Sequence, residues 1–304
     1  MEDSSNNQSQ IAPGISTADL NNVFSSAKIV TNYSQAVQTA VPDIQNGELW
    51  ALPIKADVSH AKANAAYWIS SICPGITKEI PQSIIDFNQQ FQTVYGTISN
   101  DLTQIQSQPN AIPTAAQKVD VDQSLNSLLD KITGLKSSAE SLLSDISTFN
   151  VNLNNNQNQL NVDLNTVVGK FLNGASNVQT LTAMLNTNFL NCQVLGPCNS
   201  IVMIDFNINF KVVQTGADPD LISIIYTKTI LETQIQNIQS AQTAAQLVLD
   251  TWTILNTKMA SVIQDLNDTQ DDGYANFIIQ LDLDNAQQQW QQLAEYAQTL
   301  ITNN

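Results

Sequence analysis

The sequence predicts a mainly α-helical protein: an elongated antiparallel bundle of long helices, with a small β-tongue head inserted between two of them. Apolar residues recur at steps of three and four over several long stretches, which is typical of helices with one buried face. One shorter stretch alternates with a period of two, which is typical of a strand. Hydrophobic residues make up 42% of the 304 residues, so the chain can bury a sizeable core.

The charge of the chain excludes nucleic acid as a partner. All 11 basic residues are lysine and 27 residues are acidic, which gives a net charge of −16. Binding to phosphates requires clustered Lys and Arg. The chain also has a single histidine, His60, and three cysteines, which offer few groups for acid–base, nucleophilic or zinc chemistry. The sequence therefore predicts no enzyme, no cofactor and no metal site.

The N-terminal residues 1–16 show no apolar period and contain Pro13 and Gly14, so we expect a flexible tail. Their polar, acidic start lacks the basic and apolar segments of a secretory signal. No run of about 18 apolar residues occurs, so we expect no transmembrane helix. We expect a protein that is secreted or released without a visible signal and is soluble until it meets a target-cell membrane.

The bundle is predicted to occupy residues 17–172 and 226–304. Its first helix follows the cap residues Ser16 and Thr17 and stops before Pro42. A loop through Pro53 should lead into a second apolar stripe. That stripe continues to Ile105, and Pro74 should kink or divide it because proline removes a backbone donor.

The longest stripe runs from Val121 to Phe171 as an almost faultless heptad pattern. Only the position near Asn156 is polar, so we expect one helix of about 50 residues, roughly 75 Å long, or a local irregularity there. A matching stripe runs from Leu231 to Leu266. The last helix should follow the turn at 271–273 and place Trp290, like Trp252 before it, in the bundle core.

The head is predicted at residues 173–225, where the period changes to two. Two interpretations of this strand stay open. Its apolar face covers the end of the bundle, or it is released to deliver hydrophobic surface to a bilayer. The apolar positions are Val202, Ile204, Phe206, Ile208, Phe210 and Val212.

Cys192 and Cys198 flank a Gly-Pro turn that can bring their sulfur atoms together. A disulfide between them and a simple role as small buried hydrophobes are both compatible with this spacing. Cys73 lies far away in the sequence. His60 lies beside Asp57, where a pH-sensing pair is conceivable, but an exposed or capping histidine is the favoured interpretation.

Acidic residues at 265, 268, 271 and 272 gather around a turn with Gly273. The spacing of a calcium-binding loop is absent from them, so we expect a solvated surface.

The combination of these patterns resembles the cytolysin A superfamily of α-pore-forming toxins. The similar multi-component members are the haemolysin BL and non-haemolytic enterotoxin components and the α-xenorhabdolysin-type toxins. The residues that resemble them are the heptad 121–171, the tongue 202–212 and the Trp-containing helices at 244–252 and 286–293.

The resemblance implies a protein that binds a target-cell membrane or a surface receptor and forms a homo-oligomer there, with or without a second toxin component. It also implies that the six apolar tongue residues contact the membrane. Polar residues such as Asp205 and Lys211 interrupt the tongue. This favours a component that binds the membrane, or that acts with a more apolar partner, over one that perforates it alone. The alternative is a non-lytic helical scaffold or adhesion module.

Overall fold

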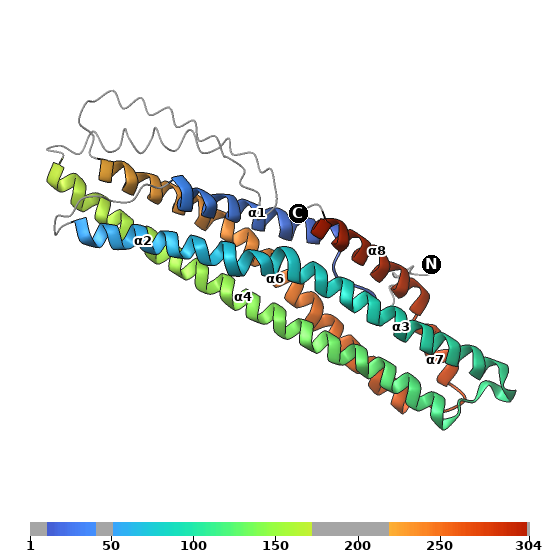
Figure 1. Cartoon of the computed structure of the whole chain (residues 1–304). Coiled ribbons are helices and arrows are strands. Elements are labelled where there is room, and N and C mark those ends of the chain that lie inside the picture. The colour runs from blue at the N-terminus through green and yellow to red at the C-terminus, as the bar shows by residue number, and fades with distance from the viewer. Residues whose placement is uncertain (1–10, 41–50, 172–218, 303–304) are drawn as a thin grey trace, which may run out of the picture. The chain divides into compact units, whose positions relative to one another are not determined.

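The computed structural model describes residues 11–40, 51–171 and 219–302, and within these ranges the chain is almost entirely helical and contains no strand. The prediction of a mainly helical protein is confirmed, whereas the predicted β-tongue lies outside the described residues. The helices, labelled in Figure 1, are α1 (Thr17–Ala40), α2 (Ala51–Tyr67), α3 (Ile80–Ser107), α4 (Ala115–Phe171), α6 (Pro219–Asp268), α7 (Tyr274–Gln280) and α8 (Leu283–Thr302).

The chain divides into two compact units. Unit 1 consists of Met1–Asn22, Thr77–Leu142 and Ala244–Asn303. Unit 2 consists of Val23–Ile76 and Leu143–Thr243, with Asn304. Each unit draws its helices from separated parts of the sequence, so its core depends on contacts between distant segments.

The first helix begins where the sequence predicts it. The backbone N–H of Ser16 donates to Asp19 Oδ2 (2.9 Å), and the backbone N–H of Asp19 approaches Ser16 Oγ at 3.2 Å. This reciprocal pairing satisfies backbone donors that the first helical turn leaves free.

Residues 11–16 are the described part of the predicted flexible tail, and several of them are buried. Ile11 is fully buried, and Ala12 and Ile15 are nearly so. The prediction of a flexible segment was wrong for these residues. They show no periodic pattern, so their burial could not be predicted locally, because the contacts that hold them are with a distant helix. The indole Nε1 of Trp290 donates to the carbonyl oxygen of Ile11 at 2.9 Å.

Helical residues run from Ala51 to Ser107, and two π-helical segments, Trp68–Ile72 and Gly75–Glu79, lie on either side of Pro74. The predicted interruption near residue 74 is thus a widened helix, as expected where proline disturbs the hydrogen-bond ladder. The predicted loop at Pro53 is wrong: this proline lies in the first turn of α2, where a missing N–H costs nothing.

The 57-residue helix α4 confirms the prediction of one very long helix, with no irregularity at Asn156. At a rise of 1.5 Å per residue, it is roughly 85 Å long. Its start is capped by Thr114, whose N–H donates to Gln117 Oε1 at 2.9 Å. The seam residues from Val121 to Leu160 are mostly buried.

Helix α6 begins at Pro219, inside the predicted head range 173–225, and proline is well suited to the first position of a helix. It ends at Asp268, before the predicted turn. A short helix, α7, which the sequence analysis did not predict, then precedes α8.

Hydrogen bonds confirm that neighbouring helices of unit 1 are antiparallel. Between α3 and α8, Gln92 pairs with Gln287 and Tyr95 pairs with Asp284. Residue numbers therefore increase along α3 as they decrease along α8. Figure 1 shows α8 lying along α3. From α4 to α6, Asn267 approaches Asp122 and Asn256 donates to Thr133, in the same opposed sense.

An aromatic cluster fills the core of unit 1. The ring of Trp290 lies 4.4 Å from Phe87 and is stacked on Trp252 at 6.0 Å. Phe91 completes the cluster. The prediction that both tryptophans pack in the core is confirmed, since Trp290 is fully buried and Trp252 is 3% exposed.

Candidate functional site

The six predicted membrane-contact residues at 202–212 lie outside the described residues, as do Cys192 and Cys198. Cys73 is fully buried and disulfide-bonded. The chain's other two cysteines are Cys192 and Cys198.

The contacts around Cys73 belong to a buried layer of unit 2. Trp68, the first residue of the π-helical segment after α2, packs its ring 5.1 Å from Phe149 of α4. Its indole N–H donates to Thr31 Oγ1 at 2.9 Å. The same hydroxyl donates to the Ala27 carbonyl and lies 3.1 Å from Cys73 Sγ. Thr31 thus joins α1 to the π-helical segment after α2, and Trp68 joins that segment to α4.

The next layer is polar and includes Asn156, the one predicted polar position of the heptad seam. Asn156 is 6% exposed. Its Nδ2 donates to the Asp57 carbonyl at 3.0 Å, and its Oδ1 accepts from Asn64 at 2.7 Å. A single polar residue in a helical seam fixes the register of the two helices. Asn156 does so here for α2 and α4.

Replacing Asn156 with alanine is expected to lower the free energy of unfolding by about 1–3 kcal/mol, because two hydrogen bonds between helices are lost. Urea unfolding followed by circular dichroism measures this change. The control is Asn155→Ala, an exposed neighbour on the same helix, which should change stability by less than about 0.5 kcal/mol. Equal effects of the two substitutions would contradict the register role.

A polar groove of about 400 Å³ opens beside this layer. His60 lies on its wall with its side chain 70% exposed, and its Nδ1 is 3.7 Å from Asp57 Oδ1. The favoured prediction of an exposed histidine is confirmed. The groove is lined by Asp57, His60, Ala63, Asn64, Asn152, Asn155, Asn156 and Gln159.

Asp163, on α4, is 4% exposed, and its carboxyl group approaches Asp57 of α2. Burial, a side-chain hydrogen bond with Asp57 and the negative charge of Asp57 raise the pKa of Asp163 to about 7, against a smaller opposing effect of Gln159. Unit 2 therefore contains a buried carboxyl group, that of Asp163, whose pKa lies near neutral pH.

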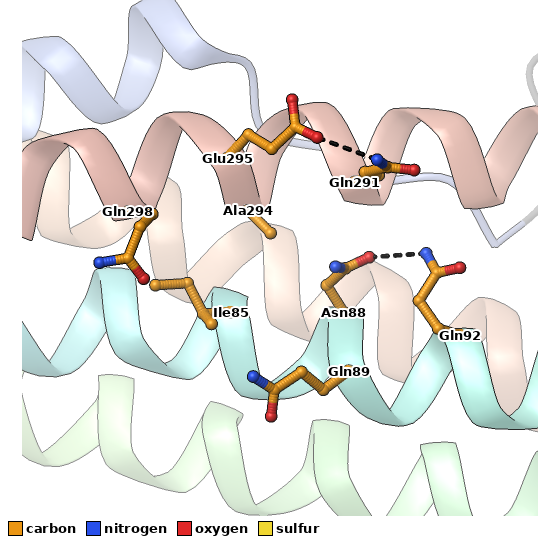
Figure 2. A pocket seen from close by; sticks show the side chains of 8 residues that line it. All are labelled: Ile85, Asn88, Gln89, Gln92, Gln291, Ala294, Glu295 and Gln298. Atoms are coloured by element: carbon orange, nitrogen blue, oxygen red, sulfur yellow. Dashed lines mark hydrogen bonds between the residues drawn. The ribbon is translucent and has the colours of Figure 1, made fainter.

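A second groove, of about 430 Å³, lies between α3 and α8 of unit 1 (Figure 2). Gln92 donates to Asn88 at 3.0 Å, and Gln291 donates to Glu295 at 2.9 Å, so these side chains are paired along each helix. The groove contains amides and one carboxylate but no nucleophile or imidazole. Its lining residues are Ile85, Asn88, Gln89, Gln92, Gln291, Ala294, Glu295 and Gln298.

The acidic turn after α6 is solvated, as predicted. Asp271 forms an ion pair with Lys118, whose ammonium also lies 5.5 Å from the centroid of the Tyr274 ring. Among the described residues, no three Asp, Glu, His or Cys side chains converge as metal ligands. Within the same residues, no helix has the length and hydropathy needed to cross a bilayer.

A family model described as Bacillus haemolytic enterotoxin (HBL) matches residues 10–188, which is more than half of the chain. The chain belongs to this family. The predicted resemblance to haemolysin BL components is therefore confirmed. No match was found among curated protein sequences.

The HBL-family chain also shares its fold with solved toxin structures. The Bacillus cereus HblL1 toxin component has a TM-score of 0.70 and 12% identity, with 97% of this chain and 98% of that chain covered. Soluble SmhB, from the tripartite α-pore-forming toxin Smh of Serratia marcescens, has a TM-score of 0.68 and 14% identity over 94% of this chain and 90% of that one. The structure of the SmhB pore has a TM-score of 0.63 and 12% identity, with 94% of this chain and 98% of that chain covered.

The sequence analysis did not identify Asp163 as a buried titratable residue. It lies next to the apolar seam, and its partner Asp57 is on another helix, so neither residue forms part of a local motif. The one available signal was an acidic residue within an otherwise amide-rich and apolar stretch of the long helix.

Proposed function

We propose that this member of the HBL family is one component of a multi-component pore-forming toxin that binds a target-cell membrane and assembles there. The observation that supports this most strongly is the family match over residues 10–188. The fold shared with HblL1 and with the components of Smh supports it too, because those proteins are toxin components.

In this proposal the protein acts without catalysis, and its membrane contact is made by the predicted tongue. The net charge of −16 opposes binding to anionic bilayers. A neutral lipid, a glycan or a protein receptor is therefore the expected docking partner. The protein is released from its cell and acts at the target membrane, as a homo-oligomer with a second component.

The test is release of an encapsulated dye from neutral phosphatidylcholine liposomes and from cultured cells. The purified protein is assayed alone and mixed with other HBL-type components from the same source. We expect lipid-dependent oligomers of the chain alone, and strong release only in the mixtures. If lipid leaves the oligomeric state unchanged and no mixture releases dye, the protein is a scaffold and the proposal is wrong.

A further inference from the structure

The contact between the carboxyl groups of Asp57 and Asp163 is a hydrogen bond only when one of the two groups carries a proton. Both side chains are carboxyl groups, and ionised carboxylates only accept hydrogen bonds. The Asp163 side chain is 4% exposed, and no donor among the described residues reaches its Oδ2. The Asp57 side chain, which Asp163 approaches, is 15% exposed. Two charges this close and this buried would repel strongly.

Among the described side chains, the surroundings of the pair give little compensating charge. The neutral amide of Gln159 reaches Asp163, and the positive form of His60 can reach only Asp57, from an exposed position. The shift of the pKa of Asp163 arises from burial and from Asp57. The other charged residues with described side chains in unit 2 are Lys28, Lys55, Lys62 and Asp145.

We propose that Asp57 and Asp163 hold one shared proton between α2 and α4, and that loss of this proton loosens the contact between the two helices. Asn156, which bonds the Asp57 carbonyl, sets these helices in the register that brings the two carboxyl groups together. The pair then acts as a pH-dependent latch within unit 2. The inference concerns the protein before it meets a membrane and does not depend on the proposed function.

The direction of the pH effect follows from the raised pKa. The folded state keeps a proton on Asp163 up to about pH 7, whereas an unfolded aspartic acid loses it near 3.8. The folded state thus binds more protons between these values, so the stability of the contact falls as the pH rises through this window. The latch is closed at mildly acidic pH and weakened above neutral pH.

Hydrogen exchange of α2 and of residues 150–165, corrected for the intrinsic effect of pH on exchange, measures the opening of the latch. For a pKa of about 7, we expect the ratio of open to closed protein to rise roughly tenfold from pH 6 to pH 8. Asp163→Asn should remove this dependence, since an amide donates to Asp57 at every pH. His60→Gln should keep it, and so should Asp130→Asn on an exposed part of α4.

Equal protection of the wild type at both pH values would overturn the proposal, and so would loss of the pH dependence in His60→Gln. If Asp163→Asn does not fold, Asp57→Asn provides the second test. That variant removes the neighbouring charge that raises the pKa of Asp163, so the midpoint of the pH dependence should move to lower pH. An unchanged midpoint would contradict the shared proton.

Discussion

Replacing Trp290 with alanine is expected to lower the free energy of unfolding of unit 1 by about 3–5 kcal/mol, the usual cost of removing a buried aromatic side chain. The ring is fully buried and touches Phe87, Phe91 and Trp252. The substitution leaves a cavity between α3, α6 and α8, which a rigid aromatic cluster cannot fill. Chemical denaturation followed by circular dichroism measures the loss.

The same substitution should release the segment before α1. Trp290 Nε1 donates to the carbonyl oxygen of Ile11, and this bond helps to hold an otherwise irregular segment in the core. Limited proteolysis near Ile15 should therefore become faster in Trp290→Ala. Trp290→Phe keeps one aromatic ring but loses the donor and part of the indole, so its stability cost should be smaller, about 1–3 kcal/mol.

The control for this prediction is Ile254→Ala on α6. The isoleucine is 54% exposed, so its removal should change stability by less than about 0.5 kcal/mol. A loss in Trp290→Ala no larger than in this control would mean that the aromatic cluster does not stabilise unit 1.

Periodic elements were the part of the fold that the sequence could predict. A heptad pattern repeats the same physical requirement at every turn, so even the 57-residue α4 was predicted from residue types alone. The same holds for the start of α1, where Ser16 and Asp19 satisfy each other locally. In both places the residues that determine the local structure are only a few positions apart in the sequence.

Contacts between distant residues were the part that the sequence could not predict. Ile11 is held by a hydrogen bond from Trp290, and the pKa of Asp163 is raised to about 7 because its side chain is buried between helices and meets Asp57. The sequence separation of such pairs follows no regular pattern, since their contact depends on how the helices pack side by side.

Substitutions in the predicted tongue should have the second large effect, a loss of membrane binding and of dye release. Fully burying one phenylalanine side chain is worth about 1.5–3 kcal/mol. Phe206→Asp/Phe210→Asp removes two such side chains and adds two charges that a bilayer disfavours. We expect membrane affinity to fall at least roughly a hundredfold, since each 1.4 kcal/mol is a factor of ten. Dye release should be lost with it, while helical circular dichroism stays unchanged.

The alternation of the tongue sequence supplies a control with the same added charge. Asn207→Asp/Asn209→Asp also introduces two carboxylates, but at the intervening polar positions. If the apolar positions make the membrane contact, this variant should keep most of its activity, because side chains at alternate positions of a strand point to opposite faces. Equal losses in both double variants would show that charge alone determines the effect, and the proposed contact through Phe206 and Phe210 would then be wrong.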